Sequence, residues 1–126
     1  SNDLKNINFA ILGLSFKPNT DDIRYSTSIS IGNLLIEAGA KINAYDPKAM
    51  QNVKKIYPDY NLKNNPYDTC NQVDAIILGT EWDEFRALDL NKLKTIVKKP
   101  MIFDLRNIYD PTEMKNIGWE YISVGR

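Results

Sequence analysis

The side chains best able to bind a ligand stand in three short segments, each directly after an apolar run. These are residues 15–26 (SFKPNTDDIRYS), 79–86 (GTEWDEFR) and 104–111 (DLRNIYDP). Lys17 carries an ammonium group just beyond the first run, where it could meet a phosphate or another ligand oxygen. Arg106 follows the third run, and its planar guanidinium could grip a phosphate or carboxylate, or stack on a base. Together they predict a site for an anionic ligand.

The first of these segments lacks the glycines of a dinucleotide cradle. Residues 15–26 contain no glycine, and Gly13 just before them stands alone, so the G-x-G-x-x-G pattern is absent and close approach of a pyrophosphate to bare backbone is not supported. The cation of Lys17 could take the place of that cradle. Ser26, Thr27 and Ser28 begin a helix whose amino end favours anions.

Arg24 has two interpretations. It could reach a ligand, or it could form a loop-stabilising ion pair with Asp21 or Asp22, which lie close to it in sequence. The residues themselves leave both open.

Arg106 and the aromatic residues of the second segment also have structural alternatives. Arg106 could pair with Asp104 or Asp110 instead of a ligand. Trp82 and Phe85 could stack on a ligand, but apolar residues three apart at a helix start favour anchorage in the core.

The remaining polar candidates favour structural roles. Glu81, Asp83 and Glu84 are expected to face solvent or the amino end of their helix, although an acid pair could in principle transfer protons. The chain has no histidine, so neither a Cys-His pair nor a histidine metal site can be built around Cys70. We interpret Cys70 as structural and predict no metal site. Asp46 is interpreted as a turn former with the proline that follows it.

The elements that must position these loops follow from apolar runs and turn residues. Ser26 is a candidate cap for a helix that stops at Gly39. Short apolar strands alternating with helices favour an α/β fold, here a Rossmann-like three-layer sandwich with a mainly parallel sheet of about five to six strands. Its strands are expected at 8–14, 41–45, 60–62, 74–80, 99–107 and 119–125, and its helices at 26–38, 50–56, 67–72 and, once or twice, within 81–97. In such a sheet the three loops should meet beyond the carboxyl ends of the strands, where strand order reverses.

Length and composition indicate one soluble domain spanning residues 1–126. Lys and Arg number 16 and so do Asp and Glu, with no basic block, which argues against nucleic acid binding. No apolar run is long enough for a membrane span or a signal peptide, so we expect a cytoplasmic protein without a membrane partner. The first two residues, Ser-Asn, are interpreted as a cloning remnant on a fragment of a larger protein.

The three loops, in this order, resemble the C-terminal, UDP-binding domain of the UDP-glucose/GDP-mannose dehydrogenase family. Residues 12–47 are similar to that family's G-x-x-F-K-x-x-T-x-D-x-R-x-S segment with its following helix and terminal D-P. TEWDEF and FDLRNIYD match the second and third characteristic segments. The resemblance covers nearly the whole chain.

The resemblance implies roles for single residues. Phe16 and Lys17 match the F-K pair that contacts the nucleotide-sugar substrate, and Arg106 matches the D-x-R arginine that also binds it. Arg24 matches the arginine that reaches NAD, the cofactor held mainly by the family's N-terminal domain. Asp22 matches the acid that precedes this arginine and could simply orient it.

The family oxidises a sugar primary alcohol to a carboxylate in two NAD-dependent steps. It uses a catalytic cysteine, a lysine and a glycine-rich dinucleotide fold, none of which has a match here. The resemblance therefore implies a substrate-binding domain with no catalytic residues. Such a domain would be inactive alone and could be a monomer. Its partners would be a UDP-sugar and the N-terminal and central domains of a parent chain that usually forms a homodimer.

Two other functions stay open. One is a standalone nucleotide-sensing module without enzyme activity. The other is a receiver-like phosphoacceptor domain, which needs a lysine after a late strand, where this chain has Arg106.

Overall fold

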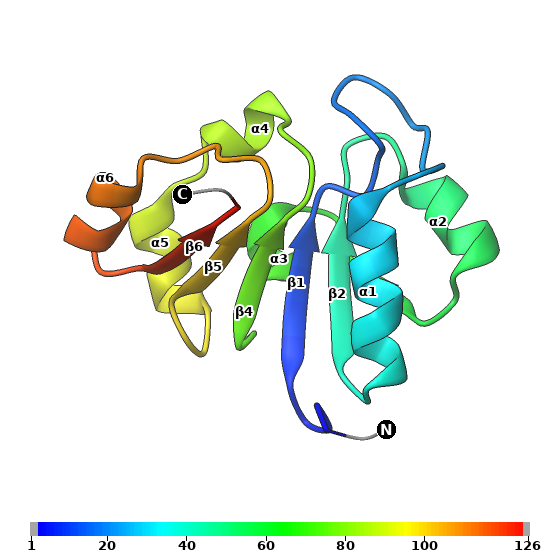
Figure 1. The fold of residues 1–126 in the computed structure, drawn as a ribbon, viewed down its shortest axis with the longest axis horizontal. Coiled ribbons are helices and arrows are strands. Elements are labelled where there is room, and N and C mark those ends of the chain that lie inside the picture. Colours follow the sequence, from blue (N-terminus) through cyan, green and yellow to red (C-terminus); the bar gives the residue numbers. More distant parts are fainter. Residues whose placement is uncertain (1–2, 125–126) are drawn as a thin grey trace.

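The computed structural model describes residues 3–124, which form one wholly parallel six-stranded sheet with helices on both faces (Figure 1). The strand order is β3-β2-β1-β4-β5-β6, the doubly wound order in which the chain reverses direction across the sheet between β1 and β4. The predicted α/β class and mainly parallel sheet are confirmed. The strands are β1 (Asn8–Leu12), β2 (Lys41–Tyr45), β3 (Tyr60–Leu62), β4 (Ala75–Leu78), β5 (Met101–Asp104) and β6 (Glu120–Ser123).

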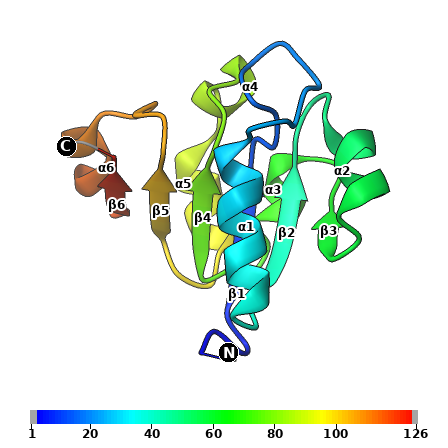
Figure 2. The same ribbon diagram turned by 45° about the vertical axis from the view of Figure 1, so that its right-hand side comes forward.

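The helices divide between the two faces of the sheet. Two apolar clusters define the faces: one joins the strands to α1 and α2, the other joins them to α3, α4, α5 and α6. In the view turned by 45°, α1 lies in front of β1, and β5 and β6 are seen to one side without a helix in front of them (Figure 2). The helices are α1 (Thr27–Glu37), α2 (Met50–Ile56), α3 (Pro66–Thr69), α4 (Asp83–Arg86), α5 (Leu90–Ile96) and α6 (Pro111–Asn116).

Local chemistry sets the first strand and helix. Ser26 caps α1 as predicted, since its Oγ accepts a hydrogen bond from the Ile29 backbone N–H at 3.3 Å. The predicted strand 8–14 is too long, because Gly13 takes a φ of +96° and ends β1 at Leu12. Leu14 is nonetheless fully buried.

The second half of the chain holds the larger differences from the prediction. The edge strand at 60–62 is confirmed, but the helix expected at 67–72 is α3, which Asn65 caps one residue before its start at Pro66. Helix α6 was not predicted at all. Its start signals are present in the sequence, because Asp110 caps it and Pro111 occupies its first turn.

Among residues 3–124, no helix combines the length and apolar character that crossing a bilayer requires. The interpretation of residues 1–2 as a cloning remnant concerns positions outside the described residues.

Candidate functional site

The three predicted loops do meet beyond the carboxyl ends of β1, β4 and β5. Arg106 joins them, since its Nε donates to the Gly79 carbonyl at 3.1 Å and its Nη2 donates to the Phe16 carbonyl at 3.1 Å. The Thr80 hydroxyl adds a buried hydrogen bond of 2.8 Å to the Ser15 carbonyl. The contacts lie at the reversal of strand order, where open α/β sheets bind ligands.

The alternative in which Arg106 pairs with a carboxylate is wrong. Among residues 3–124, neither Asp104 nor Asp110 lies within ion-pair distance of its guanidinium. Arginine has five N–H donors, and the two hydrogen bonds to carbonyls leave the others available to a ligand. The guanidinium is therefore oriented by backbone oxygens, and no acid of the described residues forms an ion pair with it.

Asp104 shapes the loop that carries Arg106. Its fully buried carboxylate accepts hydrogen bonds from the backbone N–H of Arg106 at 2.9 Å and of Ile108 at 2.7 Å. It also accepts from the Tyr109 N–H at 3.2 Å and from the Tyr121 hydroxyl at 2.6 Å. These hydrogen bonds fold the turn after β5 over its own last residue, so the backbone of Arg106 is held in place.

Asp46 plays a wider part than the predicted turn former. Its Oδ1 does form the turn, accepting from the N–H groups of Lys48 and Ala49 at 2.9 Å each. Its Oδ2 reaches across the sheet and accepts from the N–H groups of Leu14 at 2.7 Å and Ser15 at 3.0 Å. The same oxygen accepts hydrogen bonds from the Ser15 hydroxyl at 3.1 Å and from the indole N–H of Trp82 at 3.3 Å.

Asp46 is therefore a buried carboxylate that ties the loops after β1, β2 and β4 together, a role that the sequence prediction missed. A signal for it exists. Asp46 directly follows a buried strand, the same position that singled out the segment around Arg106.

The backbone of the site is packed more tightly than a dinucleotide cradle allows. A Cβ on Gly13 would lie 2.6 Å from the Thr80 backbone nitrogen, and a Cβ on Gly79 would lie 1.6 Å from the Ser28 hydroxyl oxygen. Both glycines thus bring protein segments together and do not open space for a pyrophosphate. This agrees with the missing glycine pattern in the sequence.

The cationic tip of the first loop stands outside this packed base. Phe16 is fixed through its backbone, since its N–H donates to the Asp22 carbonyl at 2.6 Å, while its side chain is 43% exposed. Lys17 is exposed, and within residues 3–124 its ammonium group makes neither a hydrogen bond nor an ion pair. Its charge is available to a ligand.

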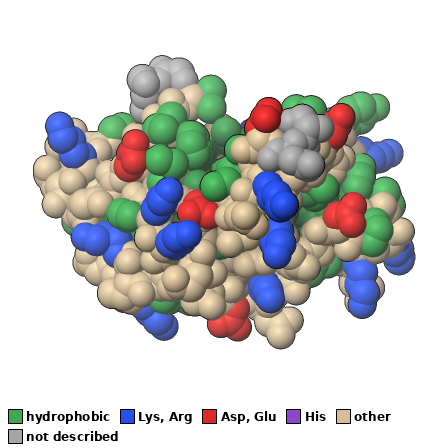
Figure 3. All heavy atoms as spheres, turned by 90° about the horizontal axis from the view of Figure 1, so that it is seen from below, with side chains coloured by type: hydrophobic (Ala, Val, Ile, Leu, Met, Phe, Trp, Pro, Cys, Tyr) green, Lys and Arg blue, Asp and Glu red, His purple; other side chains and the backbone are tan. Residues whose placement is uncertain are grey.

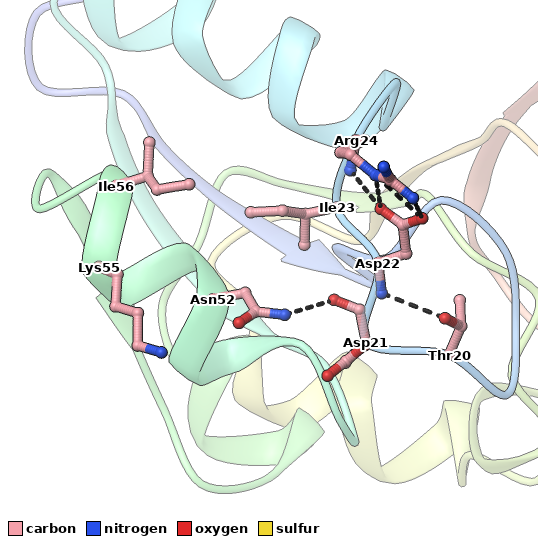
Figure 4. Close-up of a pocket in the computed structure, with 8 residues that line it drawn as sticks. All are labelled: Thr20, Asp21, Asp22, Ile23, Arg24, Asn52, Lys55 and Ile56. Atoms are coloured by element: carbon pink, nitrogen blue, oxygen red, sulfur yellow. Dashed lines mark hydrogen bonds and ion pairs between the residues drawn. The ribbon is translucent and has the colours of Figure 1, made fainter.

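Arg24 forms the ion pair that the sequence left open, and its partner is Asp22 (Figure 4). Its Nη2 donates to the Asp22 Oδ2 at 2.9 Å and its Nε donates to Oδ1 at 3.1 Å. Hydrogen bonding from Arg24 lowers the pKa of Asp22 to about 2, so the acid is ionised at neutral pH. The Arg24 side chain is still 80% exposed, so the ion pair leaves the outer edge of the guanidinium accessible.

A hollow of about 470 Å³ separates this ion pair from α2. The side chain of Asn52 on α2 crosses its base and donates to the Asp21 carbonyl at 2.8 Å (Figure 4). Arg24 lines the hollow, together with Lys55 and Ile56 of α2. Phe16 and Arg106 are hydrogen-bonded to one another, whereas Arg24 lines a separate hollow beside α2.

The other candidates are structural. Trp82 and Phe85 are buried in the core as predicted. Cys70 is fully buried, and burial raises the pKa of its thiol to about 12, which keeps it protonated at neutral pH and agrees with a structural role. Glu84 accepts a hydrogen bond from the Tyr45 hydroxyl at 2.8 Å. No group of three or more metal-ligating side chains gathers within the described part of the chain.

A comparison with protein families identifies the arrangement. Residues 10–111 match the model of the UDP-glucose/GDP-mannose dehydrogenase family, UDP binding domain. The chain belongs to this family. The match includes all three loops of the site, so the resemblance noted from the three sequence segments is confirmed.

Relatives of this UDP binding domain are longer proteins. UDP-glucose 6-dehydrogenase of Rhizobium meliloti (strain 1021) is 44% identical over 124 residues, covering 98% of this chain and 28% of the relative. The chain thus spans less than a third of the length of the curated relatives that it matches.

Solved structures share the fold. The NDP-N-acetyl-D-galactosaminuronic acid dehydrogenase from Methanosarcina mazei Go1 has a TM-score of 0.84 at 26% identity, over 98% of this chain and 26% of that one. A UDP-glucose dehydrogenase from Pyrobaculum islandicum has a TM-score of 0.74 at 27% identity, again over 98% and 26%.

Proposed function

We propose that residues 1–126 are the nucleotide-sugar-binding domain of an NAD-dependent UDP-sugar 6-dehydrogenase. The parent enzyme oxidises the primary alcohol of the sugar to a uronic acid in two NAD-dependent steps. The observation that carries the proposal is the placement of Arg106, which links three loops at the reversal of strand order within a chain of this family.

The substrate side of the proposal rests on three residues. Lys17 meets the phosphates with an ammonium group that has no partner among residues 3–124, and Arg106 binds the nucleotide with the donors that its carbonyl partners leave available. The exposed ring of Phe16 packs against the ligand beside them. UDP-glucose is the substrate named for the relatives, and we propose a UDP-sugar here. The domain's contribution to the reaction is to orient this substrate and exclude water.

The cofactor side rests on Arg24. Gly13 and Gly79 pack against other protein segments and do not form a dinucleotide cradle, so we propose that NAD is bound mainly by an N-terminal domain of the parent chain. The exposed outer edge of Arg24 fits a contact with a cofactor phosphate, with Asp22 orienting the guanidinium from behind. NAD supplies the hydride acceptor of the reaction, and Arg24 helps to hold it.

The rest of the proposal concerns the parent enzyme. Its N-terminal and central domains carry the catalytic residues, so the present chain alone is inactive and monomeric, while the parent forms a homodimer. A cytoplasmic location remains a prediction. A standalone nucleotide-sensing module is the second possibility, and the small share of each relative that the chain covers argues against it.

A titration of the chain with UDP, followed by nuclear magnetic resonance, tests the binding role. We expect amide shifts in the loops after β1, β4 and β5, with a Kd in the millimolar range, about −4 kcal/mol. Lys17→Ala should weaken binding about fivefold, the equivalent of roughly 1 kcal/mol for an exposed charge contact. Arg106→Lys should weaken it more, because a lysine keeps the charge but cannot make the same two hydrogen bonds to carbonyls.

Lys41→Ala is the matched control, since it removes an exposed cation at the amino end of β2, whereas the site lies beyond the carboxyl ends of the strands. Equal effects of the Lys17 and Lys41 variants would reduce the role of Lys17 to general charge. Tighter binding of GDP than UDP would contradict the uridine assignment. Unchanged UDP binding in both the Lys17 and the Arg106 variants would overturn the proposed site.

A further inference from the structure

One half of the sheet has a bare face. Helices α1 and α2 cover β1, β2 and β3 on this side, while β4, β5 and β6 have helices only on the opposite side (Figures 1 and 2). Ile11, Ile77, Phe103 and Ile122 are neighbours in register on β1, β4, β5 and β6. Along this row the exposed fraction rises from 0% at Ile11 and 4% at Ile77 to 47% at Ile122. The row therefore runs from beneath α1 out to solvent.

The bare face contains a groove of about 350 Å³ beside α1. Its lining is entirely hydrophobic and comes from the start of the chain, α1 and three strands: Leu4, Phe9, Ile31, Leu35, Ile77, Phe103 and Leu105. Seen from below, hydrophobic side chains gather in a hollow on this side of the molecule (Figure 3). Parallel sheets are normally covered on both faces, and a large apolar patch marks an interaction surface.

The chemistry of the lining selects a helix as occupant. The groove offers no polar side chain, so an extended segment lying in it would leave backbone N–H and C=O groups without partners. A helix satisfies these groups internally and presents only apolar side chains. Such a helix, packed parallel to α1, would complete the layer that α1 and α2 begin. At 1.5 Å per residue, a helix as long as α1, which has 11 residues, spans about 16 Å.

The place where the described chain starts indicates where this helix comes from. Leu4 lines the groove, and its backbone N–H donates to the Ala38 carbonyl at the end of α1 at 2.9 Å. The described chain thus starts at one end of the groove, and a parent polypeptide that continues upstream would approach the domain there. The curated relatives are more than three times as long as their matched segment, which provides such residues.

A second copy of the chain is a poorer occupant. A two-fold dimer sets the same surface of both copies face to face, so a hollow would meet a hollow. The shape of this face calls for a convex, apolar partner.

We propose that a segment of the parent polypeptide upstream of the present chain forms an amphipathic helix that packs its apolar face into this groove, alongside α1. The inference rests on the proposal that the chain is part of a longer dehydrogenase, but it does not depend on which nucleotide or sugar that enzyme binds. It gives the domain a second function, as the docking surface that fixes its position on the rest of the enzyme.

Thiol labelling tests the proposal without any nucleotide. Leu35→Cys and Phe103→Cys place reporters in the groove from α1 and β5, and the buried Cys70 contributes little background. Each variant is made in the 126-residue chain, in a version extended by about thirty residues upstream, and in the whole parent. Maleimide labelling is mapped by mass spectrometry, and circular dichroism checks folding. We expect labelling at least about tenfold slower in both longer versions than in the 126-residue chain.

Asn91→Cys is the matched control, because Asn91 is exposed on α5, on the opposite face of the sheet. It should label at the same rate in the 126-residue chain and the extended version. Fast labelling of the groove in every version overturns the proposal, and so does protection that appears only in the whole parent. Protection already present in the 126-residue chain, with a dimer in size-exclusion chromatography, would assign the groove to a second copy instead. If either reporter variant fails to fold, the other decides.

Discussion

The loops after β1 and β5 are both held by a buried aspartate, but the two carboxylates reach over different distances. The carboxylate of Asp104, the last residue of β5, accepts hydrogen bonds from three backbone amides within five residues of itself and from the Tyr121 hydroxyl on β6. Asp46 follows β2 yet bonds the start of the loop after β1 and the indole of Trp82, more than thirty residues away. One carboxylate therefore folds its own loop, and the other joins three.

The difference matches what each loop presents. The loop after β5 is short, and Arg106 stands two residues from its anchor, so its guanidinium reaches fixed carbonyl partners. The loop after β1 is long, and the anchor at Leu14 and Ser15 fixes only its base. Lys17 lies beyond that base with no hydrogen bond or ion pair among residues 3–124. A ligand at this edge would meet one preorganised cation and one that must still be ordered.

Replacing Asp46 should have the largest effect. Asp46→Ala removes the acceptor of several buried N–H groups from two loops, and each unsatisfied group costs about 1–3 kcal/mol. We expect the free energy of unfolding, measured by urea denaturation, to fall by about 3 kcal/mol or more. Asp46→Asn should lower the free energy of unfolding nearly as much, because either orientation of the amide points its NH2 group at backbone N–H donors.

Asp104→Ala is the comparison for this variant. It should destabilise the protein less and shift amide resonances mainly around Arg106 and β6, whereas Asp46→Ala should shift the loops after β1, β2 and β4 together. Equal losses of stability with equally widespread shifts would remove the distinction between a local and a long-range anchor.

The contrast also explains what the sequence could and could not predict. Alternating apolar runs and turns were enough for the strands and the meeting of the three loops, because parallel strands bring their carboxyl ends to one edge. The partners of single side chains were not predictable in the same way. Arg24 pairs with Asp22, two residues away, which is one of the two interpretations that local spacing left open. Arg106 instead bonds carbonyls 27 and 90 residues away, which only the folded sheet brings near.

Asp46 was underestimated for the same reason. Its short-range hydrogen bonds to Lys48 and Ala49 are a turn, which the sequence predicts, but its bonds to Leu14 and Ser15 depend on β1 and β2 pairing in register. The helix α6 is a different case. Asp110 and Pro111 are recognisable helix-start signals in the sequence, but the prediction assigned both residues to the third loop.

A substitution of intermediate size sharpens the description of the loop after β5. The Tyr121 hydroxyl donates to Asp104 at 2.6 Å from the neighbouring strand β6. Tyr121→Phe removes a hydrogen bond to a charged group and should cost about 1–2 kcal/mol of unfolding free energy. Resonances of Arg106 and Ile108 should shift, since their amides share the same carboxylate, and those of Lys17 should not.

Tyr67→Phe is the control for Tyr121→Phe. The Tyr67 hydroxyl accepts a hydrogen bond from the exposed Asp89 amide at 3.0 Å, so its loss removes a neutral hydrogen bond in which Asp104 takes no part. It should cost less than Tyr121→Phe and leave Arg106 unmoved. An effect of Tyr121→Phe that reached the loop after β1 would mean that Asp104, too, acts over a long range.

The smallest effect is expected at the tip of the loop after β1, where Asp22 and Arg24 pair in solvent. Hydrogen bonding from Arg24 holds the pKa of Asp22 at about 2, below its ordinary 3.8. A lowered pKa means that the pair's stabilisation is present above about pH 3.8 and disappears as the pH falls towards 2. Arg24→Ala should return the Asp22 pKa towards 3.8 in a carboxyl-carbon titration. The free energy of unfolding at neutral pH should change little, because exposed ion pairs are screened.

Lys17→Ala removes a weaker Coulombic influence on the same carboxylate and should raise the pKa of Asp22 less. An Asp22 titration that Arg24→Ala leaves unchanged would mean that the backbone of the loop, and not the arginine, sets this pKa. A large loss of stability at pH 7 would instead make the tip an anchor comparable to Asp46.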